Sequence, residues 1–562
     1  MKQRQENLRI YFIYAFFILF FFSLVTRIAY LQIVQKDLFK KLAQNQHLKI
    51  IPLKGERGRI FDRKGRILAT NLNVYSIYAD PKLIDEKIRT AKALASILNL
   101  DNKEVLTKLR KKSRFVWIKR KITPDQKTNI EKIKLKGIGF IKDRMRFYPQ
   151  GRLLAHTLGG VNIDNEGIEG IELFYDRYLR GKDGLVSVVS DSACNSLFFS
   201  PRILKPQRGL DIFLTIDAQI QYWAETYLKE TIEEYSAKGG SVVVVQPMTG
   251  EILALANCPS FDPNYISSTP QRFIRNIAVT DIFEPGSVFK IATLVAAVDR
   301  KPFSLEDRIY CEKGNFKIPG SVLHDWKPYG DLSLKEVFKK SSNIGVAKIA
   351  TTLGASILYE YIKKLGFGQK TGIDLPGESS SLLKHPRAWS KTSSYIIPIG
   401  QEIGITILQL ARSMCVITNG GYLVKPHLGK RLVGEYGFVK EAGVQKAKVF
   451  ASSVASTVKD ILIEVVEDGT GRLAKIEDLH VGGKTGTAQK FDLKLGRYSP
   501  NAYRASFAGF IEKQGSYFVI SVSIDEPKKS HFGGVVAAPL FKKIAQKVIK
   551  YMWLEKEIAK IR

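Results

Sequence analysis

An uncharged apolar run near the N-terminus constrains the fold of this chain more than any other feature. Residues 10–26 (IYFIYAFFILFFFSLVT) carry no charge, and residues 28–31 (IAYL) extend the run past Arg27. At about 1.5 Å per residue, a helix over 10–31 reaches across a hydrocarbon core of about 30 Å. The run therefore predicts a single transmembrane helix at residues 10–31.

The charges that flank this run predict its orientation. Lys2, Arg4 and Arg9 precede it, so the positive-inside rule places residues 1–9 in the cytoplasm and the rest of the chain outside. Four cations on the far side weaken the rule: Arg27, Lys36, Lys40 and Lys41. A cleaved signal peptide is the alternative, but the aromatic run is long and no small-x-small cleavage site follows it. Since no second apolar span appears, we expect a single-pass protein.

The excess of positive charge suggests a polyanionic partner. Lys and Arg number 87 against 54 Asp and Glu, a net charge of +33, which suits either nucleic acid or a charged envelope surface. The densest part, residues 108–146, holds fifteen cations and three acids. Under the predicted topology this run lies outside the cytoplasm, which favours anionic lipid or cell-wall polymer over nucleic acid. The alternative is a solvated surface without a partner.

Length and cysteine content argue against a single small domain, a zinc protein and a disulfide-rich protein. A chain of 562 residues exceeds the usual domain length of roughly 100 to 200 several times over, so we expect two or three folded units. Cys194, Cys258, Cys311 and Cys415 lie far apart, and the seven histidines form no His-x-x-x-His pair. We therefore expect neither a zinc site nor a disulfide framework, and no metal or other cofactor.

The pattern along the chain indicates an N-terminal unit and a larger second unit. Residues 55–69 (GERGRIFDRKGRILA) alternate charged and apolar side chains around three glycines, which predicts short strands joined by tight turns. Composition changes at residues 201–209 (PRILKPQRG), where we place the boundary into the second unit.

The second unit has the pattern of a mixed α and β domain. Its clearest elements are a helix over 217–233, a hairpin of 241–245 and 251–256 around a turn at 247–250, strands at 505–511 and 517–524, and a last helix with Leu540, Ile544, Val548 and Tyr551 on one face. Because strands stand at both ends with helices between them, we expect an α+β fold whose terminal segments share one sheet.

A serine and a lysine three residues apart are the first candidates for chemistry. Ser287 and Lys290 stand in Pro285-Gly286-Ser287-Val288-Phe289-Lys290, at the predicted start of a helix. On a helix, i and i+3 project from one face, so the amine can lie near the hydroxyl. A serine becomes a nucleophile when a neighbour removes its proton, and a lysine of lowered pKa can do so. Alone, this pattern is common in any lysine-rich chain.

Two further motifs support a catalytic role for Ser287 and Lys290. Ser341-Ser342-Asn343 follows Ser287 by 54 residues, and Lys484-Thr485-Gly486-Thr487 lies in an apolar, glycine-containing stretch. Ser-x-x-Lys, Ser-Asp-Asn and Lys-Thr-Gly form the signature of β-lactamases and penicillin-binding proteins, and the order and spacing match here. The chain resembles class B penicillin-binding proteins, which are membrane-anchored peptidoglycan transpeptidases.

Motifs outside these three extend the resemblance over nearly the whole chain. They are Arg57 to Gly65 (RGRIFDRKG), Arg146 to Pro149 (RFYP), Gly170 to Glu172 (GIE), Leu214 to Asp217 (LTID) and Phe261 to Asn264 (FDPN). Ser341 to Gly345 (SSNIG), Ser506 to Gly509 (SFAG) and Phe115 to Arg120 (FVWIKR) resemble the cell-division (penicillin-binding protein 3) subtype more than the elongation subtype. Val288, where threonine is common, and Gln401 to Gly404 depart from the usual pattern without changing a catalytic group.

The resemblance implies a serine acyl-enzyme mechanism. Ser287 attacks the carbonyl of the penultimate D-alanine of a stem peptide, Lys290 is the base, and Ser341 passes the proton to the leaving amine. An amine from a neighbouring stem then resolves the acyl-enzyme into a cross-link. The backbone N–H groups of Ser287 and Thr487 form the oxyanion hole, and such a donor is typically worth about 3 kcal/mol.

The remaining motif residues are expected to bind substrate. By the same resemblance Asn343 binds the peptide amide, while Lys484, Thr485 and Thr487 hold the terminal carboxylate. Gly486 is expected to let the strand edge approach the substrate closely. No metal is required, and β-lactams should acylate the same serine.

The resemblance also implies a domain layout and partners. We expect a cytoplasmic N-terminus at 1–9, a transmembrane helix at 10–31, an elongated pedestal of the dimerisation type at 32–205 and a penicillin-binding, β-lactamase-like domain at 206–562. Expected partners are stem peptides, lipid-linked glycan strands, β-lactams, a SEDS-family polymerase, other division proteins and the cytoplasmic membrane, with no nucleic acid. The alternatives are an elongation-type transpeptidase, a D,D-carboxypeptidase, a non-catalytic β-lactam sensor and a silent scaffold.

Overall fold

The computed structural model describes residues 2–40, 48–190, 196–301, 303–435, 437–492 and 496–561. Its contacts group the chain into two compact units, Met1–Glu56 with Gly181–Gly209, and Arg57–Arg180 with Leu210–Arg562. Compactness and function need not divide a chain at the same residue, so the functional boundary at 205 stays a prediction.

The first unit holds the apolar N-terminal helix and a small sheet. Helix α1 (Lys2–Ala29) continues into the π-helical turn η1 (Tyr30–Val34). Strands β1 (Leu48–Leu53), β8 (Gly184–Ser190) and β9 (Ser196–Leu204) form an antiparallel sheet in the order β1-β8-β9. Within the described residues, 7–34 is the one helical stretch long and apolar enough to cross a membrane. Its phenylalanines are well exposed, which in lipid is the favourable state.

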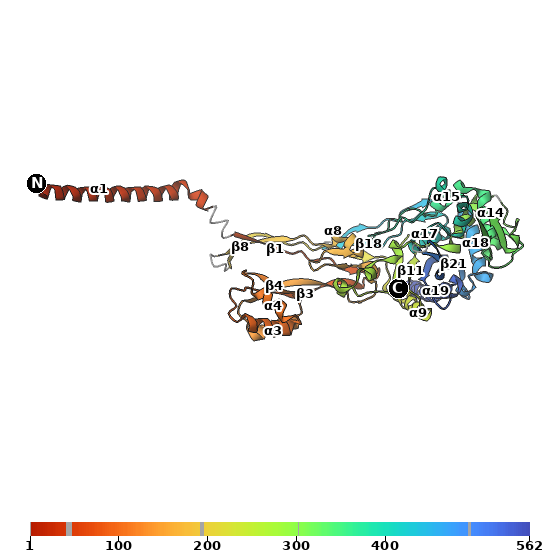
Figure 1. Cartoon of the computed structure of the whole chain (residues 1–562), viewed down its shortest axis with the longest axis horizontal. Coiled ribbons are helices and arrows are strands. Elements are labelled where there is room, and N and C mark those ends of the chain that lie inside the picture. The colour runs from red at the N-terminus through yellow and green to blue at the C-terminus, as the bar shows by residue number, and fades with distance from the viewer. Residues whose placement is uncertain are drawn as a thin grey trace. The chain divides into compact units, whose positions relative to one another are not determined.

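The second unit begins with the strands predicted around residues 55–69. Strands β2 (Ile60–Phe61) and β3 (Ile67–Ala79) pair antiparallel across a tight turn at Gly65, whose φ is 84°. Strands β4 (Val116–Ile122) and β5 (Ile138–Phe147) flank β3. Helices α3 (Lys87–Leu98), α4 (Asn102–Leu109) and α5 (Pro124–Ile133) lie beside these strands, drawn in orange in Figure 1, and share a small core with them.

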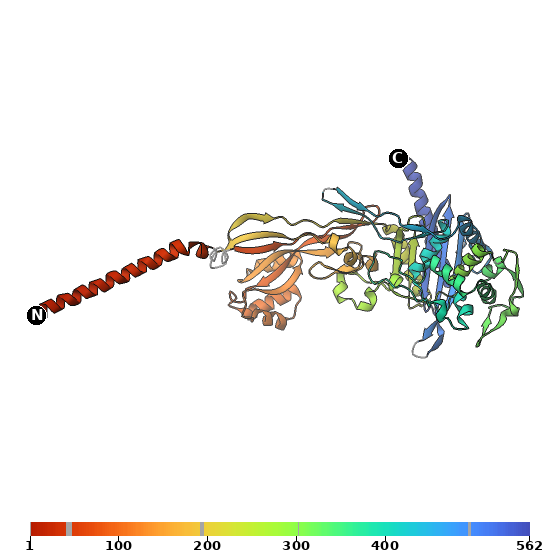
Figure 2. The same ribbon diagram turned by 90° about the horizontal axis from the view of Figure 1, so that it is seen from above.

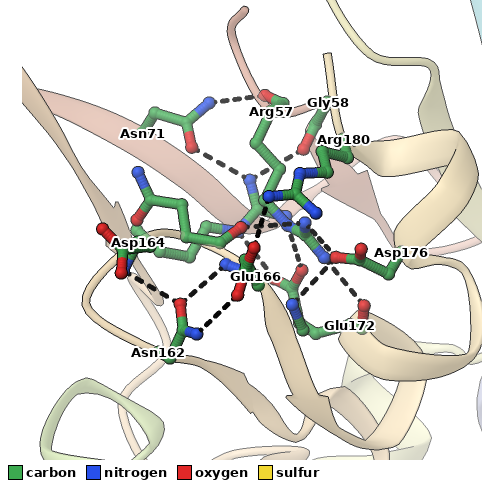
Figure 3. A network of polar contacts seen from close by, with 12 residues as sticks. Arg57, Gly58, Asn71, Asn162, Asp164, Glu166, Glu172, Asp176 and Arg180 are labelled. Carbon is green, nitrogen blue, oxygen red and sulfur yellow. Dashed lines mark hydrogen bonds and ion pairs between the residues drawn. The ribbon is translucent and has the colours of Figure 1, made fainter. Parts of the chain in front are cut away.

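A buried ionic network joins three of the motifs carried by the resemblance (Figure 3). Glu172 is fully buried, and its carboxylate bonds Arg57 Nε at 2.7 Å and Arg146 Nε at 2.6 Å. Arg57 also pairs with Asp176, and Arg146 donates to the carbonyl of Gly58. Burial alone would raise the pKa of Glu172, but the two guanidinium groups outweigh it and lower that pKa. These motif residues therefore hold strands and loops together.

The C-terminal part of the second unit is built on a five-stranded antiparallel sheet. Its order is β12 (Ile252–Cys258), β11 (Gly239–Val245), β23 (Ser516–Asp525), β22 (Arg497–Lys513) and β21 (His480–Asp492). The predicted hairpin is β11 and β12, and the C-terminal strands β22 and β23 join it, which confirms that the terminal segments share one sheet.

Both faces of this sheet are covered by helices, as the two views show (Figures 1 and 2). Val242 and Val244 of β11 belong to a core with α9 (Ala218–Glu234) and α19 (Gly533–Ile561), and the intervening Val243 and Val245 to a core with α12 (Lys290–Arg300) and α17 (Ile407–Thr418). Since successive strand residues point to opposite faces, one apolar run fills both cores.

Helix α19 is held at its start and again at Tyr551, before its last turns. At its start, Gly533 N–H donates to Thr487 Oγ1 at 3.0 Å. Near its end, Tyr551 OH lies 3.2 Å from the carboxylate of Asp217, and the Lys64 ammonium lies 4.1 Å from the centre of the tyrosine ring. Lys64 also donates to the Tyr551 hydroxyl. The final helix thereby connects the motif strand β21 with the turn after β2.

Smaller elements complete the second unit. The strands are β6 (Gly160–Val161), β7 (Gly167–Glu169), β10 (Asp211–Leu214), β13 (Arg308–Tyr310), β14 (Asn315–Ile318), β15 (Ser321–His324), β16 (Asp331–Ser333), β17 (Tyr422–Val424), β18 (Gly429–Gly434), β19 (Gly437–Glu441) and β20 (Lys446–Lys448). The helices are α6 (Ala155–Leu158), α7 (Gly170–Phe174), α8 (Asp176–Leu179), α10 (Gln271–Ile274), α11 (Ile277–Thr280), α13 (Leu334–Lys339), α14 (Asn343–Leu353), α15 (Ala355–Lys364), α16 (Ser393–Ile396) and α18 (Ser452–Asp468), with short 3₁₀ turns between them.

Candidate active site

The first motif lies where a 3₁₀ turn becomes a helix. Ser287 is in η3 (Gly286–Phe289) and is partly exposed, whereas Lys290 opens α12 and is fully buried. The Ser287 hydroxyl makes no hydrogen bond to any residue that the structure describes. The amine expected beside it donates instead to the second motif, because three acceptors there surround it. The serine is therefore open to an incoming substrate while the lysine is held behind it.

The lysines of the first and third motifs meet at one serine. Lys290 Nζ donates to the Ser341 carbonyl at 2.7 Å, to Ser341 Oγ at 3.2 Å and to Asn343 Oδ1 at 2.7 Å. Lys484 Nζ donates to the same Ser341 Oγ at 2.8 Å. One hydroxyl thus lies between two buried amines, and the proximity of Lys290 and Lys484 that the mechanism needs is present.

Burial disfavours the charged form of both amines, and the Lys484 charge adds to this effect at Lys290. Burial lowers the pKa of Lys290 well below its usual value, and the nearby Lys484 charge lowers it further, while Asp325 opposes both effects. Burial lowers the pKa of Lys484 to about 7. A neutral amine can accept a proton, so the geometry can supply a base near neutral pH.

The second motif forms a turn at the start of α14. Ser342 caps this helix, since its Oγ accepts from Gly345 N–H at 2.9 Å. Ser341, one residue earlier, has φ of 59°, a left-handed conformation that is uncommon for a residue with a side chain. This conformation directs both Ser341 oxygens to Lys290.

The third motif occupies the edge strand β21. Lys484 and Thr485 are buried, and Thr487 is partly exposed. A Cβ atom on Gly286 would lie 2.8 Å from the Thr487 carbonyl, so the backbones of η3 and β21 run in close contact. The two backbone N–H groups expected to form the oxyanion hole, those of Ser287 and Thr487, come from these adjoining segments.

Gly486 lies against the turn that carries Ser287. A Cβ atom there would lie 2.4 Å from Ser506 Oγ and 2.6 Å from the Pro285 carbonyl and Val288 Cγ2. The missing side chain therefore makes room for this turn. The close approach of the strand edge to substrate stays a prediction.

No cluster of three His, Cys, Asp or Glu that could hold a metal ion occurs among the described residues. Cys258 is half-buried, and Cys311 and Cys415 are buried and free. Cys194 lies outside the described residues.

Several residues around the site carry no pattern that sequence reasoning could use. Asp325 accepts from Ser342 Oγ at 2.6 Å and from two N–H groups at the start of α14. Thr470 bonds Thr485 Oγ1 at 3.1 Å, and Glu284 accepts from Tyr498 OH at 3.0 Å. Each is a single polar residue in a loop or strand, remote in sequence from its partner.

Comparisons with known proteins give the family. Residues 240–546 match the penicillin binding protein transpeptidase domain, and residues 52–214 match the penicillin-binding protein dimerisation domain. Stage V sporulation protein D of Bacillus subtilis is 34% identical over 547 residues, 95% of this chain and 84% of the relative. Peptidoglycan D,D-transpeptidase FtsI of Escherichia coli K12 is 32% identical over 548 residues, 95% and 90% of the two chains.

A solved structure agrees with these matches. Penicillin binding protein 3 of Mycobacterium tuberculosis, complexed with aztreonam, superposes with a TM-score of 0.71 at 27% identity, covering 89% of this chain and 97% of that one. The two domain matches, the full-length relatives and this likeness all agree with the three motifs, and the chain belongs to the class B penicillin-binding proteins.

Proposed function

We propose that the protein is a serine acyltransferase that cross-links peptidoglycan stem peptides in septal wall synthesis during cell division, and that β-lactams inhibit it covalently. Peptidoglycan D,D-transpeptidase activity follows from the family. The septal assignment rests on the division-type motifs and on the FtsI relatives. The observation that carries the chemistry is the convergence of Lys290 and Lys484 on Ser341 Oγ behind an accessible Ser287.

Acylation uses these groups in sequence. The neutral amine of Lys290 removes the proton of Ser287, whose oxygen forms a bond to the carbonyl of the penultimate D-alanine. The N–H groups of Ser287 and Thr487 stabilise the oxyanion. When the tetrahedral intermediate collapses, the C–N bond breaks and Ser341 gives its hydroxyl proton to the departing D-alanine amine, while the proton that Lys290 took from Ser287 passes to the Ser341 oxygen.

Substrate binding would change the charge of the site. Lys484, Thr485 and Thr487 line the edge strand where the terminal carboxylate is expected, and Asn343 is placed for the peptide amide. An arriving carboxylate favours protonated Lys484, whose pKa lies at about 7 in the free protein. The positive Lys484 then disfavours protonated Lys290. Binding of the correct ligand would therefore keep the base neutral.

The membrane topology belongs to the same proposal. The apolar helix within residues 7–34 anchors the chain, with residues 1–9 in the cytoplasm and the pedestal (32–205) and transpeptidase domain (206–562) outside it. A SEDS-family polymerase and other division proteins are the proposed partners of the anchor and pedestal. Exposed cations in the 108–146 run, Arg110, Lys111, Lys112, Lys132 and Lys134 among them, would contact anionic wall polymer or lipid head groups.

One reaction separates this function from its alternatives. A stem pentapeptide is incubated with the detergent-solubilised protein and an amine acceptor. Cross-linked dimers are expected from a transpeptidase, hydrolysis alone indicates a carboxypeptidase, and no turnover indicates a sensor or scaffold. In parallel, Ser287→Ala should abolish covalent labelling by fluorescent penicillin without lowering the melting temperature. Undiminished labelling of that variant would refute the assignment of the nucleophile.

A further inference from the structure

A three-residue segment outside the three motifs makes several hydrogen bonds to the second motif. His324 is the last residue of strand β15, Asp325 and Trp326 follow it, and the three residues face the turn formed by residues 340–344. Four hydrogen bonds with unremarkable distances join them: Trp326 Nε1–H to the Lys340 carbonyl at 3.1 Å, Ser342 O–H to Asp325 Oδ2 at 2.6 Å, Ile344 N–H to Asp325 Oδ1 at 3.2 Å, and Asn343 Nδ2–H to the His324 carbonyl at 2.8 Å. A fifth, shorter bond runs from Asn343 N–H to Asp325 Oδ1.

Asp325 accepts three of these five hydrogen bonds. Its two carboxylate oxygens accept three hydrogen bonds at the N-terminal end of α14, where unpaired N–H groups and the helix dipole favour a negative charge. Hydrogen bonds to a charged acceptor are shorter and stronger than neutral ones. The carboxylate thus fixes the backbone of Asn343, and the His324 carbonyl fixes its amide, whose oxygen then points to Lys290.

The turn needs such a restraint because Ser341 is in an unfavourable conformation. A residue with a side chain at φ of 59° costs free energy and persists only when its surroundings determine it. The segment holds the residues on both sides, Lys340 through Trp326 and Ser342 through Asp325. With these neighbours fixed, the Ser341 carbonyl and hydroxyl stay on the Lys290 amine.

We infer that Asp325 is a positioning residue for acyl transfer, which holds Ser341 and Asn343 in their reactive geometry and sets the charge balance around Lys290. The inference rests on the proposed function, since it assigns a role within that same site. Asp325 does not touch the nucleophile, and it acts through Ser342, Asn343 and the field at Lys290.

The second part of this role is electrostatic. Two charged groups act on the buried Lys290 amine: Lys484, which disfavours its protonation, and Asp325, which favours it. Removing the Asp325 charge leaves Lys484 unopposed, so the amine loses its proton at lower pH. Because the base must be neutral to react, the acid limb of the acylation profile should move to lower pH. A purely structural role would not move this limb.

The test uses the full-length protein in detergent and fluorescent penicillin. The second-order acylation rate constant of wild type, Asp325→Asn and Ser342→Ala is measured from pH 5 to 9, with the melting temperature of each. Asp325→Asn should acylate about tenfold to a hundredfold more slowly, the loss expected for a charge-assisted hydrogen bond, and its acid limb should move to lower pH. Ser342→Ala removes one bond and no charge, so its rate should fall while its acid limb stays in place.

The matched control is Asp331→Asn, which removes an exposed carboxylate from strand β16 of the same region and should change neither rate nor profile. An Asp325→Asn rate within twofold of wild type, or a slower rate with an unmoved acid limb, overturns the inference. If Asp325→Asn does not fold, the acylation rates of Ser342→Ala and Trp326→Phe test the inference instead. Wild-type rates for both variants would overturn it. Labelling of Ser287→Ala would refute the proposed function instead, so the two failures are distinguishable.

Discussion

Replacing Glu172 with glutamine should destabilise the protein far more than any exposed carboxylate would. Glu172 is fully buried between Arg57 and Arg146, whose side chains are almost as inaccessible. Glutamine is nearly isosteric, so the packing is retained, but the buried Arg146 loses its Glu172 counter-charge and Arg57 keeps only that of Asp176. Removing one partner of a buried ion pair costs about 3 to 5 kcal/mol. At about 2 °C per kcal/mol for a large domain, the transition should fall by about 6 to 10 °C.

The assay is thermal unfolding of the full-length protein followed by circular dichroism at several pH values. Because the pKa of Glu172 is lowered in the folded state, its stabilisation is fully present above the unfolded pKa of about 4.3 and is lost as pH falls through the lower folded value. The difference between wild type and Glu172→Gln should therefore shrink in acid.

The matched control is Glu166→Gln, which removes the exposed partner of Arg180 in the same network region (Figure 3) and should leave the melting temperature unchanged. A Glu172→Gln transition within 2 °C of wild type at neutral pH would show that the arginines find other partners. The reasoning from burial and pairing would then be wrong.

Three further outcomes are expected. Lys484→Ala removes a charge that lowers the pKa of Lys290, so residual acylation by penicillin should shift to higher pH, and a shift to lower pH would contradict this. Gly486→Ala should slow acylation and lower stability by about 1 to 3 kcal/mol through overpacking against η3, whereas Gly330→Ala, in open space, should do neither. A triple variant with glutamine at Arg110, Lys111 and Lys112 should sediment less than wild type with anionic vesicles at low salt. Equal sedimentation would indicate a solvated surface without a partner.

Periodicity was sufficient for the regular elements of the second unit. The hairpin of β11 and β12 and the strands β22 and β23 alternate or run apolar between clear turn residues, and α19 keeps one apolar face over several turns. Strands at both ends with helices between them were enough to predict that the terminal segments share one sheet, but the order of its strands was not predicted. The helix α1 was evident from composition alone, although it begins before residue 10.

The motif residues of the site were predicted through resemblance, and their contacts were not. Spacing placed Lys290 beside Ser287, whereas the amine bonds Ser341 and Asn343, 51 and 53 residues away. Asp325 was missed because a lone acid after a short strand has no signature. The contact of Gly486 with the Ser287 turn was not predicted, because sequence cannot say which side of a strand is crowded.

The attachment of α19 has a consequence for how the chain reaches its folded state. Lys64 and Tyr551 are 487 residues apart, so the turn after β2 is synthesised long before the helix that packs on it. Contacts of such sequence separation form late and slowly. The second unit cannot close until its C-terminal strands have been made, and its early strands lack their sheet partners until then. A chain truncated before Tyr551 would lose the ring against which Lys64 and Asp217 pack. The truncation would therefore loosen the turn after β2, near the start of the second unit.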